Sequence, residues 1–285
     1  MATQSLHLHS SSPHHLHHPK LQYFPSNSQS LKWVCLKTNH SFAALKMIKK
    51  LSIFAIDGRT SSAEIKRKVV KKKLGVFVSG GGSNFRAIHQ GIIDGDVNGE
   101  VVVLVTNKPD CGGALYAKEN GIPVVVFPKV KDASVGVSTE DLVASLRSFE
   151  VDYVLLAGYL KLIPVELIQE YPRNVFNIHP SLLPAFGGKG FYGMKVHRAV
   201  IASGARYSGP TIHHVDEKYD TGRILAQKVV PVYSDDTAEK LAERVLHEEH
   251  KLYAEVAIAL CEDRVIWRED GVPLIQSEEN PNIYR

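Results

Sequence analysis

The first 56 residues of this 285-residue chain contain no aspartate, glutamate or arginine, and their lysines carry six positive charges. Residues 57–73 add seven basic and two acidic residues. Because the net charge of the whole chain is only +4, removing these eleven net positive charges leaves −7 on residues 74–285. An acidic body lacks the clustered basic surface that binds nucleic-acid phosphates. We therefore expect no nucleic-acid partner.

The chain is also poor in cysteine, with Cys35, Cys111 and Cys261 spaced too widely to suggest a pair or a metal-ligand motif. This excludes a disulfide scaffold and is typical of a reducing compartment. A hydrophobic content of 44% excludes disorder and collagen, and leaves one or two globular domains.

No apolar run near the N-terminus is long enough to cross a bilayer or to form the core of a secretory signal, so we expect no membrane partner. Residues 1–56 instead hold nine serines and seven histidines. A basic, serine-rich and acid-free segment predicts an organellar transit peptide, with a disordered basic junction up to residue 73. The lack of arginine favours the plastid stroma, and dual targeting to mitochondria stays open. The histidines at 14, 15, 17 and 18 could form a metal tract, but a biased leader explains them better.

From residue 74 onward, short apolar runs alternate with helical patterns, which predicts strands buried on both faces of a parallel sheet. After residue 206 the segments 209–215 and 223–232 flank a polar turn and predict an antiparallel pair. We expect one Rossmann-like α/β domain over 74–268, with a mostly parallel mixed sheet, helices on both faces and a tail over 269–285. The expected strands are 74–78, 101–105, 124–127, 154–157 and 175–178, with helices from about 84, 111, 139 and 164.

The last long helix is expected to begin at Asp236, with Glu239 completing a capping box. Its inward apolar stripe continues through Glu249. A buried carboxylate needs a partner, for which a substrate ammonium and a buried Arg or His are both open. The apolar members of the stripe are Leu241, Val245, Leu252 and Val256.

Three glycines, Gly80 to Gly82, separate the first expected strand from a helix, and Ser83 and Asn84 follow them. Free backbone amides and the helix dipole at such a turn favour a phosphate, although a tight structural turn is the alternative. A dinucleotide fingerprint would need glycine at Phe85, and no Walker lysine follows the glycines. We therefore favour a monophosphate site.

Asn177 and His179 lie two apart in the fifth expected strand, so both side chains share one face at its carboxyl end. An amide donor beside an imidazole suits acyl transfer, in which Asn177 stabilises an oxyanion and His179 handles protons. Asp220, in a later polar turn, could hold the imidazole and raise its pKa. There are three alternatives. Asn177 and His179 could be buried polar groups with satisfied hydrogen bonds, Asp220 could be an ordinary turn residue, or all three could bind a metal. Asparagine is a poor zinc ligand, and Ser181 lacks a nucleophile elbow.

Taken together, these motifs resemble the glycinamide ribonucleotide transformylases of the folate-dependent formyltransferase group, in a plant plastid form. The resemblance covers residues 74 to about 268 and rests on SGGGSN at 79–84, LLAGYLKLI at 155–163, NIHPSLLP at 177–184, SGPTIHHVDEKYDTG at 208–222 and the helix with Glu249.

The resemblance implies transfer of a formyl group from 10-formyltetrahydrofolate, as co-substrate, to the amine of 5-phosphoribosylglycinamide in purine biosynthesis. It implies direct attack, small-molecule substrates, no metal, and a homodimer as one possible assembly. The implied catalytic residues are Asn177, His179 and Asp220. The implied ribonucleotide site is Gly82, Ser83, Asn84, Leu246, His247, Glu248 and Glu249. The implied folate site is Leu160, Lys161, Leu162, Ile163, Asn177, Asp216, Glu217, Lys218, Tyr219 and Asp220.

Two features depart from the family pattern. An arginine that relatives use to contact folate has no match in the stretch 132–140, and the glycine-rich loop 185–194 is longer than in bacterial forms. Among rival functions, a methionyl-tRNA formyltransferase would need a further C-terminal domain, and a formyltetrahydrofolate deformylase an N-terminal regulatory domain. A non-catalytic ribonucleotide-binding module would leave Asn177, His179 and Asp220 without a role.

Overall fold

A computed structural model of the chain describes residues 70–129 and 136–284. The expected transit peptide therefore lies almost wholly outside the described residues, as does part of the stretch 132–140. The first strand, β1 (Lys72–Val78), begins two residues before the expected start of the domain. Its first two residues pair with Gly99 and Glu100 of the next strand.

The centre of the fold is a seven-stranded sheet in the order β3-β2-β1-β4-β5-β7-β8. Strands β1 to β5 are parallel, and β7 and β8 extend the sheet in antiparallel fashion. The expected mixed sheet is thus confirmed. The remaining strands of the sheet are β2 (Gly99–Thr106), β3 (Val124–Val126), β4 (Tyr153–Leu156), β5 (Val175–His179), β7 (Thr211–His214) and β8 (Ile224–Gln227).

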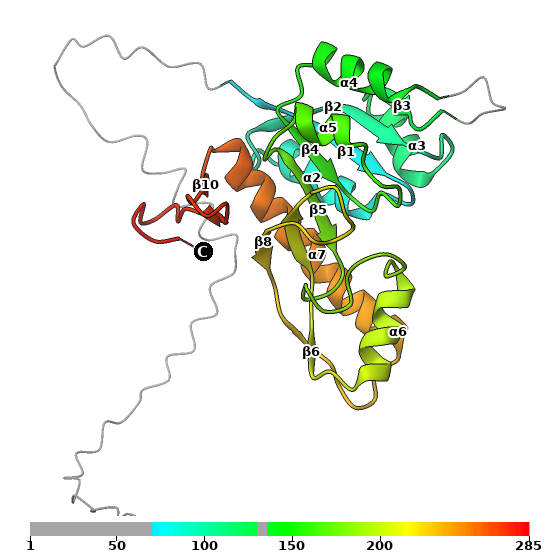
Figure 1. Cartoon of the computed structure of the whole chain (residues 1–285), viewed down its shortest axis with the longest axis vertical. Helices are drawn as coiled ribbons and strands as arrows, with labels where there is room; N and C mark the ends of the chain where they lie inside the picture. The colour runs from blue at the N-terminus through cyan, green and yellow to red at the C-terminus, as the bar shows by residue number, and fades with distance from the viewer. Residues whose placement is uncertain (1–69, 130–135, 285) are drawn as a thin grey trace, which may run out of the picture. The chain divides into compact units, whose positions relative to one another are not determined.

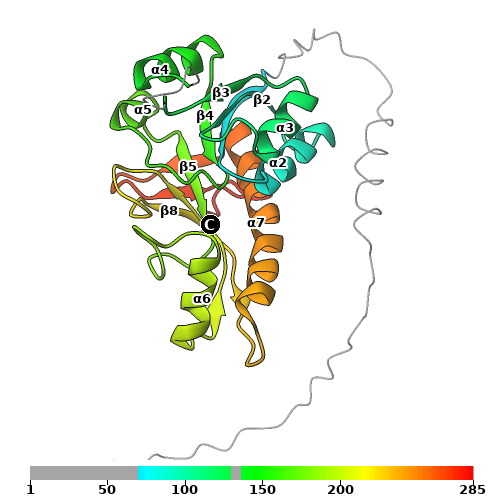
Figure 2. The same ribbon diagram turned by 90° about the vertical axis from the view of Figure 1, so that its right-hand side faces the viewer.

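Helices cover both faces of this sheet, as Figures 1 and 2 show. Alternate residues of β1 enter opposite cores: Val76 packs with α2, α3 and α7, whereas Phe77 packs with α4 and α5. This two-sided burial explains why the parallel strands are continuous apolar runs. The helices are α2 (Ser83–Ile93), α3 (Gly112–Glu119), α4 (Thr139–Ser148), α5 (Val165–Glu170), α6 (Met194–Ser203) and α7 (Ala238–Cys261).

Helix α7 corrects the expected start at Asp236, because the N-cap is Thr237, whose hydroxyl accepts from the backbone N–H of Lys240. The carboxylate of Asp236 is instead bound by Arg244. The buried stripe of α7, including Glu249, is confirmed. No helix among the described residues is long and apolar enough to cross a bilayer.

Three further elements differ from expectation. Helix α6, which was not predicted, follows the glycine-rich loop and packs against α7. The expected strand over 223–232 is two strands, because the chain leaves the main sheet after Gln227 and β9 (Val230–Pro231) pairs with β6 (Tyr207–Ser208). Part of the expected tail is β11 (Pro273–Ile275), which pairs with β10 (Val265–Trp267).

The fully buried Tyr253 of α7 ties the end of β4 to the start of β5. Its hydroxyl lies 3.1 Å from the carbonyl oxygen of Leu156 and 3.2 Å from that of Phe176. Both strands are therefore tied to the helix that carries Glu249.

Candidate active site

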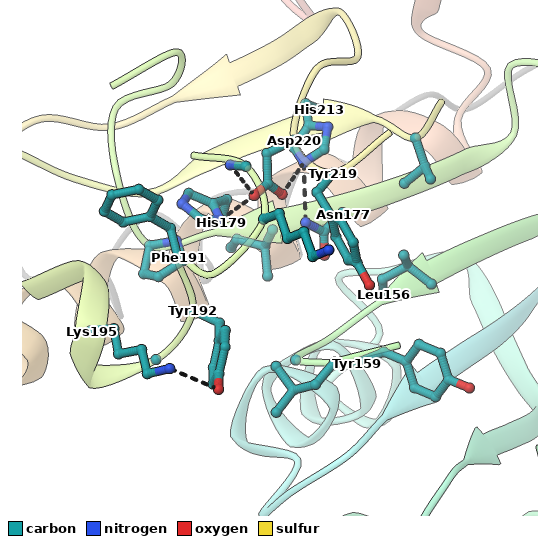
Figure 3. A pocket seen from close by; sticks show the side chains of 18 of the residues that line it. Leu156, Tyr159, Asn177, His179, Phe191, Tyr192, Lys195, His213, Tyr219 and Asp220 are labelled. Carbon is teal, nitrogen blue, oxygen red and sulfur yellow. Dashed lines mark hydrogen bonds and ion pairs between the residues drawn. The ribbon is translucent and has the colours of Figure 1, made fainter. Parts of the chain in front are cut away.

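A cavity of about 700 Å³ opens at the carboxyl ends of β4 and β5. Asn177, His179 and Asp220 meet in its wall, as Figure 3 shows. Nδ1 of His179 lies 3.4 Å from Oδ2 of Asp220. The three residues singled out from the sequence are therefore neighbours, although 41 positions separate His179 from Asp220 in the chain.

Asp220 is placed by the turn between β7 and β8, where its backbone adopts a left-handed φ of 57°. Aspartate tolerates this conformation better than most residues because its short polar side chain forms local hydrogen bonds. The backbone N–H of Gly188 donates to Oδ2 over 2.9 Å. This contact ties the carboxylate to the glycine-rich loop.

The same loop also holds His179. Nε2 of this imidazole lies 2.9 Å from the carbonyl oxygen of Phe186. A carbonyl oxygen can only accept, so Nε2 carries a proton and Nδ1 is the nitrogen that faces Asp220. The glycine-rich loop therefore contacts both members of the pair.

Burial decides the pKa of His179. It lowers the pKa below the ordinary histidine value, and the opposing charge of Asp220 and contact with Phe186 do not cancel this effect. The expected effect of Asp220 is confirmed, because its charge does raise the pKa of this imidazole, but burial outweighs it and sets the net direction. For Asp220, burial favours the neutral carboxyl, but His213, His179 and the Gly188 N–H together lower its pKa.

His213 is a member of this group that sequence reasoning missed. Its Nε2 lies 3.1 Å from the amide nitrogen of Asn177 and 3.6 Å from Oδ1 of Asp220. The antiparallel register pairs His213 on β7 directly with Asn177 on β5. The motif at 208–222 contained this histidine, but only the register reveals its contact.

The glycine turn lies at the start of α2. Gly82 is the N-cap of that helix, with a left-handed φ of 73° and no side-chain cap, so backbone N–H groups at the helix start lack an intrahelical partner. A Cβ at Gly82 would lie 2.8 Å from the Cα of Gly113, at the start of α3. Glycine is thus required by both conformation and packing.

Asn84 and Glu249 connect this turn to α7. The side-chain amide of Asn84 donates to Glu249 Oε2 over 2.6 Å, so the partner of the buried carboxyl is an amide and not the Arg or His considered from the sequence. Burial raises the pKa of Glu249, and the Asn84 hydrogen bond only partly opposes this. Oδ1 of Asn84 is buried without a protein partner. Both residues line the cavity.

A loop after β4 forms the opposite wall of the cavity. The side chain of Ser79 accepts from the backbone N–H of Leu160 and donates to Asn107, which ties this wall to the end of β1. Leu160 and Leu162 are half exposed at 51% and 48%, so they offer apolar surface at the cavity mouth.

Most of the residues implied by the resemblance line one cavity, but five do not. Gly82 and Ser83 lie beside it, next to Asn84, while Glu217, His247 and Glu248 are outside its lining. Glu248 instead pairs with Lys251. No group of three or more His, Cys, Asp or Glu within residues 70–129 and 136–284 is arranged to hold a metal ion. The implied residues in the lining are Asn84, Leu160, Lys161, Leu162, Ile163, Asn177, His179, Asp216, Lys218, Tyr219, Asp220, Leu246 and Glu249.

The family model described as formyl transferase matches residues 72–257, which include every residue of this cavity. The chain belongs to the formyl transferase family. Within the family it is 72% identical over 214 residues to a chloroplastic phosphoribosylglycinamide formyltransferase of Vigna unguiculata, covering 75% of this chain and 69% of that protein. The corresponding protein of Arabidopsis thaliana is 69% identical, covering 75% and 74%.

A solved member of the family has the same architecture. The glycinamide ribonucleotide transformylase 1 of Symbiobacterium toebii superposes with a TM-score of 0.65 at 32% identity, covering 73% of this chain and 95% of that one. The formyl transferase fold of this chain therefore extends over nearly the whole length of the bacterial protein.

Proposed function

We propose that this chain is a phosphoribosylglycinamide formyltransferase, which transfers the formyl group of 10-formyltetrahydrofolate to the amine of 5-phosphoribosylglycinamide. The observation that carries the proposal is the meeting of Asn177, His179 and Asp220 in a cavity that also reaches Asn84 and Glu249. An acyl-transfer group and a candidate ribonucleotide site then share one space. The names of the plant relatives support the same activity.

The reaction requires the protein to stabilise negative charge on the formyl oxygen and to transfer one proton. The substrate amine forms a bond to the formyl carbon, the bond from that carbon to N10 breaks, and the proton lost by the amine ends on N10. Asn177 donates an N–H to the formyl oxygen as negative charge develops there. His179 is neutral because burial lowers its pKa, so Nδ1 can accept the proton lost by the amine before that proton passes to N10. The ionised Asp220 stabilises the imidazolium formed in between.

The cavity suits both substrates on chemical grounds. Leu156, Leu160 and Leu162 provide apolar surface for a flat ring system beside the polar group of Asn177. At the other end, the start of α2 offers backbone N–H groups to a phosphate. Glu249 and the unpartnered Oδ1 of Asn84 offer acceptors to the N–H groups of a glycinamide.

The expected setting is the chloroplast. Both plant relatives are named as chloroplastic, and residues 1–56 have the composition of a transit peptide. A homodimer stays a prediction.

The decisive experiment incubates purified protein with 10-formyltetrahydrofolate, with and without 5-phosphoribosylglycinamide. We expect tetrahydrofolate and formylated ribonucleotide only when both substrates are present. Release of formate without the ribonucleotide would instead identify a deformylase, and ribonucleotide binding without turnover would identify a non-catalytic module. Asn177→Ala should lower kcat about 10²- to 10³-fold, the usual effect of losing one oxyanion donor.

A further inference from the structure

His213 is not required by the mechanism above, yet it is almost fully buried against two of its residues. Its exposed fraction is 2%, and its ring stands directly across the sheet from Asn177. A buried imidazole needs partners for both nitrogens, so its hydrogen bonds constrain its neighbours.

The first constraint comes from the backbone of the next residue. Nδ1 of His213 lies 2.8 Å from the carbonyl oxygen of His214. Because that oxygen only accepts, Nδ1 must carry a proton. In a neutral ring Nε2 then has a free lone pair, and it lies 3.1 Å from the amide nitrogen of Asn177.

The second constraint concerns the two ends of the Asn177 amide, which have opposite chemistry. One end is an N–H₂ donor and the other is an oxygen acceptor. A lone pair on Nε2 selects the orientation in which the N–H₂ group faces His213. One hydrogen of that group binds His213, and the other is left for the cavity that Asn177 lines.

We infer that His213 is a positioning residue, which in its neutral Nδ1–H tautomer orients the Asn177 amide so that an N–H, and not the oxygen, faces the formyl group. This inference rests on the proposed function, since it gives Asn177 the role of oxyanion donor. The catalytic step itself leaves His213 unchanged.

Gly222 protects the contact that sets this tautomer. A Cβ at Gly222 would lie only 1.7 Å from the carbonyl oxygen of His214 and 3.5 Å from Nδ1 of His213. The absence of a side chain at this position therefore lets His214 keep the carbonyl where His213 donates to it. Gly222 thus contributes indirectly to the orientation of Asn177, through the His214 carbonyl and the His213 ring.

The competing arrangement has a doubly protonated His213. Nε2 would then donate toward Oδ1 of Asp220, 3.6 Å away, and Asn177 would turn its oxygen toward the ring. The charged or titratable groups around the ring are Asp220, His179 and His214. The contact of His213 with Asp220, which contributes to the lowered pKa of Asp220, favours this arrangement. Its 3.6 Å separation, however, exceeds ordinary hydrogen-bond length, whereas the 3.1 Å separation from Asn177 does not.

Nitrogen NMR of the substrate-free protein tests the tautomer directly. With ¹⁵N-labelled histidine at neutral pH, we expect a protonated Nδ1 and an unprotonated Nε2 for His213, assigned by loss of the signals in His213→Gln. Protonation of both nitrogens would overturn the inference, and so would a proton on Nε2 alone.

Kinetics test the role in turnover. His213→Leu should lower kcat on the order of 10²-fold with little change in KM, because the oxyanion donor is no longer oriented. His213→Gln, whose amide oxygen can accept near the position of Nε2, should recover most of that loss. Equal losses in the two variants would contradict the inference.

A double-mutant cycle separates this role from general structural support. In an Asn177→Ala background, His213→Leu should cause no further loss of kcat, since the residue through which it acts is gone. Additive losses would overturn the inference while leaving the proposed function intact. Near-normal turnover of Asn177→Ala alone would contradict both.

Discussion

The buried carboxyl group of Glu249 and the partly buried one of Asp220 line the same cavity, and their surroundings shift their pKa values in opposite directions. Asp220 faces two imidazoles and a backbone N–H, which outweigh its burial and lower its pKa. Glu249 has only the amide of Asn84 against a stronger effect of burial, which raises its pKa. Asp220 is therefore suited to stabilising positive charge near His179. Glu249, whose ionisation is disfavoured by burial, is suited to accepting a hydrogen bond from a neutral N–H group.

The raised pKa of Glu249 predicts a pH-dependent effect of Glu249→Gln on stability. A carboxyl with a raised folded-state pKa contributes stability below its unfolded pKa, and this contribution is lost as the pH rises through the folded-state pKa. The free energy of unfolding of the natural protein should therefore fall relative to Glu249→Gln as the pH rises from about 4 through the folded-state pKa of Glu249. Urea unfolding of both proteins across this range measures the difference.

The neighbouring Glu248 provides a control with the opposite sign. Its hydrogen bond from Lys251 lowers its pKa, so its contribution is present above the unfolded pKa and is lost as the pH falls. Glu248→Gln should therefore be less stable than the natural protein near neutral pH and approach it in acid. The same trend with pH in both variants would contradict the assignment for Glu249.

Residue chemistry at the strand end was predictable, but cross-strand contacts were not. Asn177 and His179 could be placed together because a strand has a period of two, and Asp220 because its carboxylate suits a histidine. The contact of His213 with Asn177 depends on the register of β5 and β7, which pairs these two residues directly. The pKa shift of His179 could not be predicted from the sequence either, because its direction depends on how deeply the folded protein buries the ring.

At the scale of elements, the glycine turn brings two helix starts together. The backbone N–H of Gly113, at the start of α3, donates to the carbonyl oxygen of Gly80 over 3.0 Å. Gly112 and Gly113 leave space for the turn, since a Cβ on either would lie 3.2 or 3.1 Å from its nearest neighbour. The turn is therefore braced by α3 while its own helix, α2, keeps free N–H groups at its start.

This arrangement predicts that Gly82→Ala damages both stability and ribonucleotide binding. The left-handed φ costs a non-glycine residue about 1–2 kcal/mol, and contact with the Gly113 backbone adds to that. We expect a lower urea midpoint and a raised KM for the ribonucleotide, with a much smaller change in KM for folate. Gly80→Ala is the control for stability, because a Cβ there meets no atom within 4 Å. Equal stability of the two variants would show that the turn is not constrained as described.

The helix with a strong apolar stripe was predictable, whereas α6, directly after the glycine-rich loop, was not. The stripe of α7 was clear, but its start depended on whether Asp236 caps the helix or binds Arg244, and the structure has the second arrangement. Helix α6 has a short stripe of Val196 and Val200, and these residues are buried because α7 and β9 supply the other half of their core. Such elements are defined by partners far away in the sequence.

At the scale of the whole molecule, the alternating pattern was sufficient to predict a single α/β domain with two cores. The exact ends of that domain were less clear, because lysines and short C-terminal segments carry little periodic signal. Lys72 and Lys73 belong to β1, and the segment after Trp267 returns to pair with β10. The C-terminal hairpin also covers His214, whose ring lies edge-on against Trp267 at 5.3 Å between centroids.

The N-terminal end of the domain can be tested by comparing proteins that start at residue 70 and at residue 74 with the full chain. All cavity residues lie after residue 83, so both shortened proteins should keep the kcat and KM of the full chain. The protein starting at residue 74 lacks the pairing of Lys72 and Lys73 with β2, the 2.7 Å hydrogen bond from the Lys73 backbone to Asp152 and the ion pair of Lys72 with Asp263.

Loss of these strand hydrogen bonds should lower its Tm by roughly 2–8 °C, with little contribution from the exposed ion pair. Thermal unfolding followed by circular dichroism, with activity measured on the same samples, gives both quantities. A protein starting at residue 70 that is inactive although folded would mean that earlier residues contribute to the site. Equal Tm values for the two shortened proteins would instead mean that Lys72 and Lys73, the first two residues of β1, add nothing to the stability of the sheet.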